Sequence, residues 1–193
     1  MPPRMIVVAG PPGSGKSSLY PLASFGCAYF NADDRAAELN GGSYVGIPAG
    51  LRQAVNHEFE DFILGSIARR VSFAIETTLR SEITLEQARQ AKAAGFLVEM
   101  RYLALRDFET HLERVKARAD AGGHSASEAT LRRIHDASLG NLRRAIEELD
   151  LVWVYDNTEI DASHSLALEA RNGEIHFLAD DPPGWLSSAL DLP

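Results

Sequence analysis

The sequence predicts an α/β domain built on a parallel β-sheet, and three observations support this prediction. Short apolar runs alternate with longer helical patterns over the first four-fifths of the chain. The first run, Met5 to Ala9, is apolar at every position, as expected for a strand buried on both faces. The Gly-rich stretch GPPGSGKSS, residues 10–18, follows it directly and leads into a helical pattern.

The remaining elements alternate in order along the chain. Four further apolar runs predict strands at 27–30, 72–76, 96–105 and 151–155. Helical spacing fills most of the intervals, at 51–70, 81–94, 106–121 and 127–149. Pro21 is expected to end the first helix early, because proline has no N–H to donate. These elements predict a sheet of five parallel strands.

The last part of the chain has a different character. Asn172-Gly173 lies between two apolar runs, which is a strong signal for a β-hairpin at about 164–179. The stretch DDPPGWLSSAL then predicts a short helix or packed turn. No repeat or low-complexity segment interrupts the chain, so we expect a single domain over residues 1–193.

The composition excludes several functional classes. Lys and Arg total 19 against 27 Asp and Glu, a net charge of -8, which disfavours a large nucleic-acid surface. No apolar run reaches the length of a membrane span, and the N-terminus lacks the pattern of a signal peptide. A single cysteine excludes an internal disulfide. We therefore expect a cytoplasmic protein without a membrane or nucleic-acid partner.

The stretch at 10–18 fits the phosphate-loop template of Gly, four residues, Gly, Lys and Ser or Thr. Its backbone N–H groups are expected to surround the phosphates of ATP at the positive end of the following helix. Lys16 would reach the β- and γ-phosphates, and the Ser17 hydroxyl would bind Mg²⁺. The expected ATP-binding residues of the loop are Gly10, Pro11, Pro12, Gly13, Ser14, Gly15, Lys16, Ser17 and Ser18.

Polar clusters follow the second and third strands, at residues 31–35 and 76–80, where open α/β sheets bind ligands. Asp33 is placed to accept a proton from an attacking hydroxyl, although Asp33 or Asp34 could instead only cap the next helix. Glu76 could hold a substrate hydroxyl, bind Mg²⁺ through water or pair with Arg80. No segment shows four apolar residues followed by Asp, which disfavours a motor ATPase.

Arg114 and Arg118 are four residues apart on one predicted helix and therefore share a face. They precede Gly122-Gly123, a candidate flexible joint, so the region at about 106–126 predicts a lid that closes on the transferred phosphoryl group. The alternative is an ion-paired, solvated surface helix, because acidic residues surround both arginines.

The stretches GPPGSGKSS, FNADD, AIETTLRS and VYDNT, in this order and at this spacing, resemble the zeta-toxin family of small P-loop kinases. The stretch ERVKARADAGGHSASEATLRRIHDASLGNL is similar to the lid region of its short members. The resemblance covers about residues 5 to 160. It implies a five-stranded parallel sheet, ATP-dependent phosphorylation of a sugar hydroxyl and, in the toxins, UDP-N-acetylglucosamine as acceptor. An antitoxin protein is then a possible partner.

The resemblance also implies roles for individual residues. Asp33 matches the catalytic base, Lys16 the phosphate-loop lysine, and Arg114 and Arg118 the lid arginines, the second less securely because this lid is shorter. The family's substrate side is matched by Glu76, Thr78 and Arg80, together with Asp33. Asp156 and Asn157 fall at a loop expected to border the adenine, so Asn157 joins the ATP-binding set.

Other functions stay open at this point. The chain is shorter than the toxins and carries the additional hairpin, so the acceptor could be an antibiotic, a nucleoside or another sugar. A nucleotide-dependent binding module with slow ATP hydrolysis is the alternative from a different class, but it would not need Asp33 or the arginines. A polynucleotide kinase is disfavoured by the acidic balance.

Overall fold

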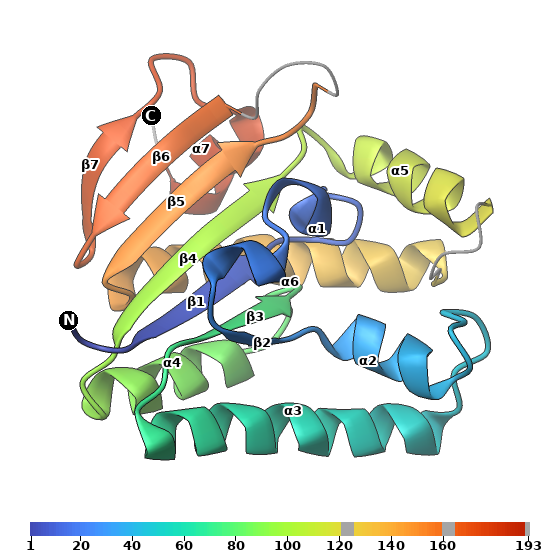
Figure 1. Cartoon of the computed structure of the whole chain (residues 1–193). Helices are drawn as coiled ribbons and strands as arrows, with labels where there is room; N and C mark the ends of the chain where they lie inside the picture. The colour runs from blue at the N-terminus through green and yellow to red at the C-terminus, as the bar shows by residue number, and fades with distance from the viewer. Residues whose placement is uncertain (121–125, 160–164, 192–193) are drawn as a thin grey trace.

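The computed structural model describes residues 1–120, 126–159 and 165–191. A seven-stranded sheet with the order β2-β3-β1-β4-β5-β6-β7 runs through the molecule (Figure 1). The strands β1 to β5 pair in parallel, whereas β6 and β7 are antiparallel. The five-stranded parallel sheet predicted from the sequence is confirmed, and the hairpin adds its two strands to the β5 edge.

The strands are β1 (Arg4–Ala9), β2 (Ala28–Phe30), β3 (Phe73–Thr77), β4 (Leu97–Ala104), β5 (Leu151–Asp156), β6 (Ser165–Arg171) and β7 (Glu174–Leu178). The helices are α1 (Lys16–Leu19), α2 (Ala32–Leu39), α3 (Ala49–Arg69), α4 (Ile83–Ala93), α5 (Phe108–Asp120), α6 (Glu128–Glu148) and α7 (Gly184–Leu190), and a 3₁₀ turn η1 spans Leu22–Phe25.

The two faces of the sheet are covered unequally. The larger apolar cluster lies between one face and the helices α3, α4, α6 and α7, and it contains fully buried residues such as Met5, Ile75 and Val152. On the other face, α1 and η1 cover a smaller cluster around Ile6 and Val8 (Figure 1). Since β1 faces both clusters, all of its residues from 5 to 9 are buried, which explains its continuous apolar run.

The C-terminal hairpin forms as its sequence predicts. Asn172 and Gly173 both have positive φ, at 50° and 83°, as a two-residue hairpin turn of type I′ requires. The turn also packs against α6, since a Cβ on Gly173 would lie 3.2 Å from the Glu147 carbonyl oxygen. Position 164 lies outside the described residues, so the hairpin begins here at Ser165.

The first helix is as short as Pro21 predicts, because α1 ends at Leu19. The region predicted as a lid contains α5, while the joint at Gly122-Gly123 lies outside the described residues. The organisation as a single domain stays a prediction. Among the described residues, no helix combines the length and the apolar character that crossing a membrane would require.

Candidate active site

The Gly-rich loop between β1 and α1 requires glycine for two reasons. Gly10, Gly13 and Gly15 all have positive φ, at 140°, 82° and 86°. Two of them also lie against neighbouring backbone: a Cβ on Gly10 would be 2.0 Å from the Leu103 carbonyl oxygen, and one on Gly13 would be 2.8 Å from that of His111. The loop is therefore held closely by β4 and α5, with no room for side chains at these positions.

Lys16 lies folded into the loop. Its side chain is 8% exposed, and Nζ donates hydrogen bonds to the carbonyl oxygens of Gly10 at 2.9 Å and Pro11 at 3.2 Å. Burial lowers the pKa of this ammonium, Glu76 and Asp33 oppose the lowering, and Arg118 adds to it. The lysine therefore lies within electrostatic range of residues from three other elements.

The side chain of Glu76 contacts the phosphate loop. In the parallel register it lies opposite Val8 of β1, one strand from the loop. Ser17 Oγ donates a 2.8 Å hydrogen bond to Glu76 Oε2, and Lys16 Nζ is 4.0 Å from Oε1. Within the described part of the chain, no ion pair joins Glu76 to Arg80, the third role considered for it.

The first turn of α2 separates the roles of its two aspartates. The cap of this helix is Asn31, whose Oδ1 accepts from the backbone N–H of Asp33 at 3.0 Å and of Asp34 at 3.3 Å. The possibility that either aspartate is the cap is therefore wrong. Tyr44 Oη donates a 2.8 Å hydrogen bond to Asp34 Oδ1. Asp33 is exposed, and its carboxylate makes no hydrogen bond or ion pair with any residue that the structure describes.

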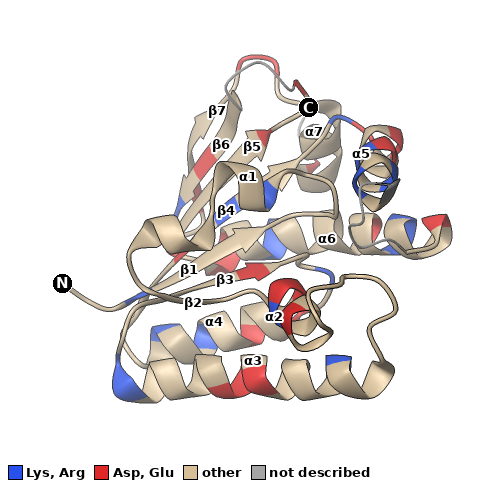
Figure 2. Cartoon of the chain, turned by 45° about the vertical axis from the view of Figure 1, so that its right-hand side comes forward, with Lys and Arg blue, Asp and Glu red and all other residues tan. Residues whose placement is uncertain are grey.

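Figure 2 shows the acidic turn of α2 and the mixed charges of α5 on the same side of the molecule. Tyr44 connects the two electrostatically: its hydrogen bond to Asp34 raises the pKa of its hydroxyl, and Arg118 partly opposes this. Sequence reasoning missed Tyr44, although an aromatic residue within the Gly-rich stretch GGSYVG was a visible signal.

The chain leaves β3 through a strained turn. Leu79 has a φ of 57° and is fully buried, which is uncommon for a residue with a side chain. Its N–H donates to Thr77 Oγ1 at 3.1 Å, and its carbonyl accepts from Asn141 Nδ2 at 2.9 Å. Such strain persists only where the surroundings impose it, and it is common at functional sites. The turn places Thr78 partly buried and Arg80 exposed on either side of it.

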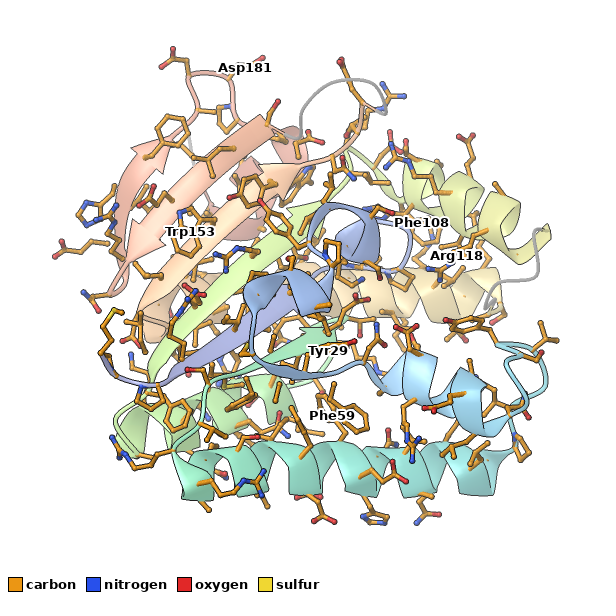
Figure 3. All side chains as sticks on the ribbon, in the orientation of Figure 1. Tyr29, Phe59, Phe108, Arg118, Trp153 and Asp181 are labelled. Atoms are coloured by element: carbon orange, nitrogen blue, oxygen red, sulfur yellow. The ribbon has the colours of Figure 1, made fainter. Side chains whose placement is uncertain are left out.

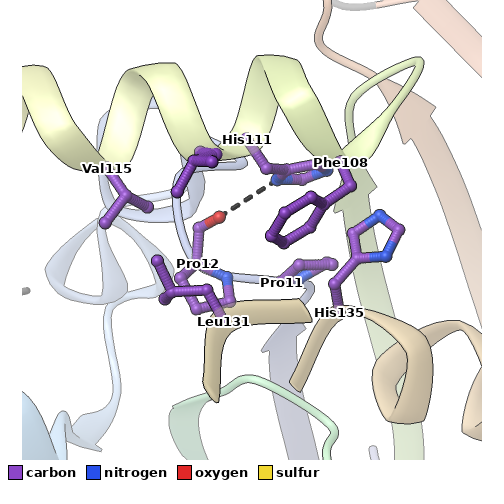
Figure 4. Close-up of a pocket in the computed structure, with 8 residues that line it drawn as sticks. Pro11, Pro12, Phe108, His111, Val115, Leu131 and His135 are labelled. Atoms are coloured by element: carbon purple, nitrogen blue, oxygen red, sulfur yellow. Dashed lines mark hydrogen bonds between the residues drawn. The ribbon is translucent and has the colours of Figure 1, made fainter. Parts of the chain in front are cut away.

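The helix α5 is joined to the loop through His111, which sequence reasoning did not single out (Figure 4). The ring is 2% exposed, and its Nε2 accepts a 3.0 Å hydrogen bond from the Leu105 N–H. Since a backbone N–H can only donate, Nε2 is unprotonated, and the proton of the neutral ring lies on Nδ1. Nδ1 then donates to the Pro12 carbonyl at 3.0 Å.

The two predicted lid arginines have different surroundings. Arg114 donates to the carbonyl oxygens of Asn157 at 2.9 Å and Thr158 at 2.6 Å. Its guanidinium is therefore bound to the loop after β5. Arg118 lies one turn further along α5, where Figure 3 shows it on the side of the helix that faces α6; it is exposed and within electrostatic range of Lys16. Asn157 in turn donates from Nδ2 to the Ser14 carbonyl at 2.9 Å.

A cavity of about 480 Å³ lies beside the loop after β5, between the ends of β5 and β6 and the segment that leads into α7. Its size is that of small-molecule pockets. It is lined by Arg106, Asp156, Thr158, Glu159, Ser165, Leu166, Ala167, Ala179, Asp181 and Pro183.

The buried His111 predicts a pH-dependent stability. Burial lowers its pKa to about 3, and the charges of Lys16 and Arg114 and the neighbouring His135 add to the lowering, which outweighs the hydrogen bond to the Pro12 carbonyl. A histidine titrates near 6.5 in the unfolded chain, so between these values only the unfolded state binds the proton. We therefore expect this residue to lower the free energy of unfolding by up to about 1.4 kcal/mol per pH unit below 6.5.

Urea unfolding at pH 7.5, 6.0 and 5.0 measures this dependence, and His111→Asn should have a shallower pH slope than the unmodified protein. Equal slopes for the two proteins would contradict a depressed pKa at this position.

Comparison with known proteins supports the fold. No protein-family model matches the chain. An uncharacterised protein of Haemophilus influenzae is 28% identical over 128 residues, which are 65% of this chain and 87% of that protein.

Two solved structures are similar over most of the chain. The AvrRxo1-ORF1:-ORF2 complex matches 98% of this chain with a TM-score of 0.71 and 16% identity. A structure from the PezAT toxin-antitoxin system of Streptococcus pneumoniae matches 84% with a TM-score of 0.61 and 16% identity. The chain spans 64% of the first of these chains and 70% of the second.

At these identities the likeness concerns the fold. It agrees with the arrangement of the described residues, in which a phosphate-loop template lies between β1 and α1 of a parallel sheet. The chain therefore has the α/β fold of these two structures, with a phosphate-loop template in its first strand-to-helix connection.

Proposed function

We propose that the protein is an ATP-dependent small-molecule kinase, which transfers the γ-phosphoryl group to a hydroxyl of a sugar nucleotide such as UDP-N-acetylglucosamine. One observation carries this proposal. Lys16 and Ser17 of the loop meet Glu76 of β3, while the unengaged carboxylate of Asp33 lies within electrostatic range of Lys16. A phosphate-binding cation, a metal-binding hydroxyl and a free base in one place are what phosphoryl transfer to an alcohol requires.

The triphosphate would lie along residues 10 to 18, with Lys16 leaving the loop carbonyls for the β- and γ-phosphates. The adenine of ATP would lie on the far side of Asn157, in the cavity of about 480 Å³. Asn157 supports this direction, because its side chain contacts the loop at Ser14 while its neighbour Thr158 lines that cavity. The AvrRxo1-ORF1:-ORF2 complex, whose fold is similar, has been solved with ATP.

Ser17 and Glu76 are the residues that would hold Mg²⁺. The pairing of a hydroxyl with a carboxylate oxygen at 2.8 Å fits the hard oxygen ligands that this ion prefers. The described residues contain no group of three or more His, Cys, Asp or Glu able to hold a metal, but Mg²⁺ at such sites takes one or two protein ligands and completes its shell with phosphate and water. When bound, it neutralises charge on the β- and γ-phosphates.

Asp33 would act as the base in the transfer step. The acceptor oxygen forms a bond to the γ-phosphorus as the bond to the β–γ bridging oxygen breaks, and the hydroxyl proton passes to the Asp33 carboxylate. ADP leaves with the bridging oxygen. Thr78 and Arg80 would position the acceptor, whereas the contacts of Glu76 favour its metal-side role over the substrate-side role expected from the resemblance. Arg118 would stabilise the charge on the transferred group.

Other acceptors, and a nucleotide-dependent binding module with slow ATP hydrolysis, are the alternatives to this proposal. An antitoxin partner stays a prediction. The two similar structures support a protein partner in general terms, because one belongs to a toxin–antitoxin system and the other to a two-protein complex.

Transfer of label from γ-labelled ATP with Mg²⁺ to UDP-N-acetylglucosamine tests the proposal. We expect a labelled sugar nucleotide with the unmodified protein and almost none with Asp33→Asn. If no label is transferred, the acceptor is wrong, and the assay is repeated with other sugars, nucleosides and a 5′-hydroxyl oligonucleotide. Tight ATP binding without transfer to any of these acceptors would favour the binding module.

A further inference from the structure

We propose that His111 and Asn157 are positioning residues, which hold two carbonyl groups of the phosphate loop from outside and thereby turn the loop's N–H groups toward the phosphates. This inference rests on the proposed nucleotide binding. It assigns a role to His111, and it gives Asn157 a role different from contact with the adenine.

The argument begins with the planarity of the peptide bond. In a trans peptide, the carbonyl and the N–H of the next residue point in opposite directions. The Pro12 carbonyl points outward to His111 Nδ1 at 3.0 Å, so the N–H of Gly13 points away from α5 and into the loop. The Ser14 carbonyl likewise points outward to Asn157 Nδ2 at 2.9 Å, which directs the N–H of Gly15 inward.

Both N–H groups remain available to a ligand. Within the described part of the chain, neither the N–H of Gly13 nor that of Gly15 donates a hydrogen bond to another residue. The side chain of Lys16 lies on the inner side, where its Nζ binds the carbonyls of Gly10 and Pro11. The carbonyls of residues 10, 11, 12 and 14 are therefore bound from outside or by Lys16, and the N–H of Ser14 donates back to Pro11 at 3.3 Å. The N–H groups of Gly13 and Gly15 stay open, as a phosphate site requires.

The two holding side chains are themselves fixed. The Leu105 N–H keeps the proton of His111 on Nδ1, which is the atom that must donate to Pro12. The α5 backbone also contacts the loop directly, since a Cβ on Gly13 would meet the His111 carbonyl oxygen at 2.8 Å. The loop that contains Asn157 is held by Arg114 through the Asn157 carbonyl. The first turns of α5 are thus a fixed support of the loop, and a closing motion would have to involve the helix beyond them.

Three variants separate positioning from simple packing. His111→Asn places an amide N–H at the position of Nδ1 and keeps the bond to Pro12, but it loses the acceptor for Leu105. His111→Gln places an oxygen near Nε2 and keeps that acceptor, but it leaves the Pro12 carbonyl unpaired. Asn157→Ala removes the hydrogen bond to Ser14 without changing α5.

Binding of Mg²⁺–ATP and of inorganic tripolyphosphate is measured by titration calorimetry, alongside the melting temperature of each variant. We expect His111→Gln and Asn157→Ala to bind both ligands about tenfold more weakly, and His111→Asn to bind within about threefold of the unmodified protein, although both His111 variants melt at lower temperature. Loss of affinity for tripolyphosphate, which has no base, distinguishes this role from contact with adenine.

Equal affinities of the two His111 variants for tripolyphosphate would overturn the role of His111, because a packing role predicts changes in melting temperature alone. If Asn157→Ala loses affinity for ATP but keeps its affinity for tripolyphosphate, Asn157 contacts the adenine and does not position the loop. If the unmodified protein binds neither ligand, the proposed nucleotide binding itself fails, and this outcome differs from the first two.

Discussion

Asp33→Asn is expected to lower the turnover number by about 10²–10⁴-fold while leaving the affinity for ATP almost unchanged. The substituted amide cannot accept the proton of the acceptor hydroxyl. It should not disturb α2, because the cap of this helix is Asn31 and its bond to residue 33 involves only the backbone N–H. Steady-state kinetics with a saturating acceptor, combined with calorimetric titration of ATP, measures both quantities.

Asp34→Asn is the matched control for this experiment. The two carboxylates are adjacent in the first turn of α2, but Asp34 already accepts a 2.8 Å hydrogen bond from Tyr44, which an amide oxygen can also accept. We expect turnover to change far less than in Asp33→Asn. Near-normal turnover of Asp33→Asn, or equal losses in both variants, would remove Asp33 from the role of base.

Arg118→Ala is expected to lower turnover by about 10³-fold, the lower end of what arginines contribute to phosphoryl transfer. The guanidinium is exposed and within electrostatic range of Lys16. It can therefore stabilise the negative charge that develops on the transferred phosphoryl group. Arg114→Ala should behave differently. It frees the carbonyls of Asn157 and Thr158, and should therefore weaken ATP binding more than it slows the transfer step.

Measuring kcat and the dissociation constant of ATP for both variants distinguishes these roles. Arg118→Lys should recover part of the lost turnover, since it keeps the charge but not the planar group. The assignment would be reversed if Arg114→Ala lost turnover at unchanged ATP affinity while Arg118→Ala remained active.

The parts of the fold that follow a local pattern were predictable from the sequence. Met5 to Ala9 is buried on both faces and is therefore apolar throughout, and Asn172-Gly173 has the positive φ angles that few other pairs adopt. The phosphate loop is also recognisable in the sequence, since its backbone has positive φ at Gly10, Gly13 and Gly15. In each case the constraint falls on consecutive residues, so it is visible in a short stretch of the sequence.

The interactions that organise the site are of another kind. His111 binds Pro12, 99 positions away in the chain, and Ser17 binds Glu76, 59 positions away. Nothing in the residues around His111 distinguishes a histidine that holds a loop from one that packs in a core. The target of Arg114 depended in the same way on where the loop after β5 lies. By contrast, Asn31 could have been named as a cap, because Asn is a preferred residue at this position.

The placement of the hairpin bears on which purine the protein would select. The strands β6 and β7 extend the sheet at the edge opposite β2, away from the turn that carries Asp33. Six of the residues around the cavity beside Asn157 come from β6 or from the segment between β7 and α7. If the base lies there as proposed, a choice between adenine and guanine resides in the last thirty or so residues, and it can change without altering the surface presented to the acceptor.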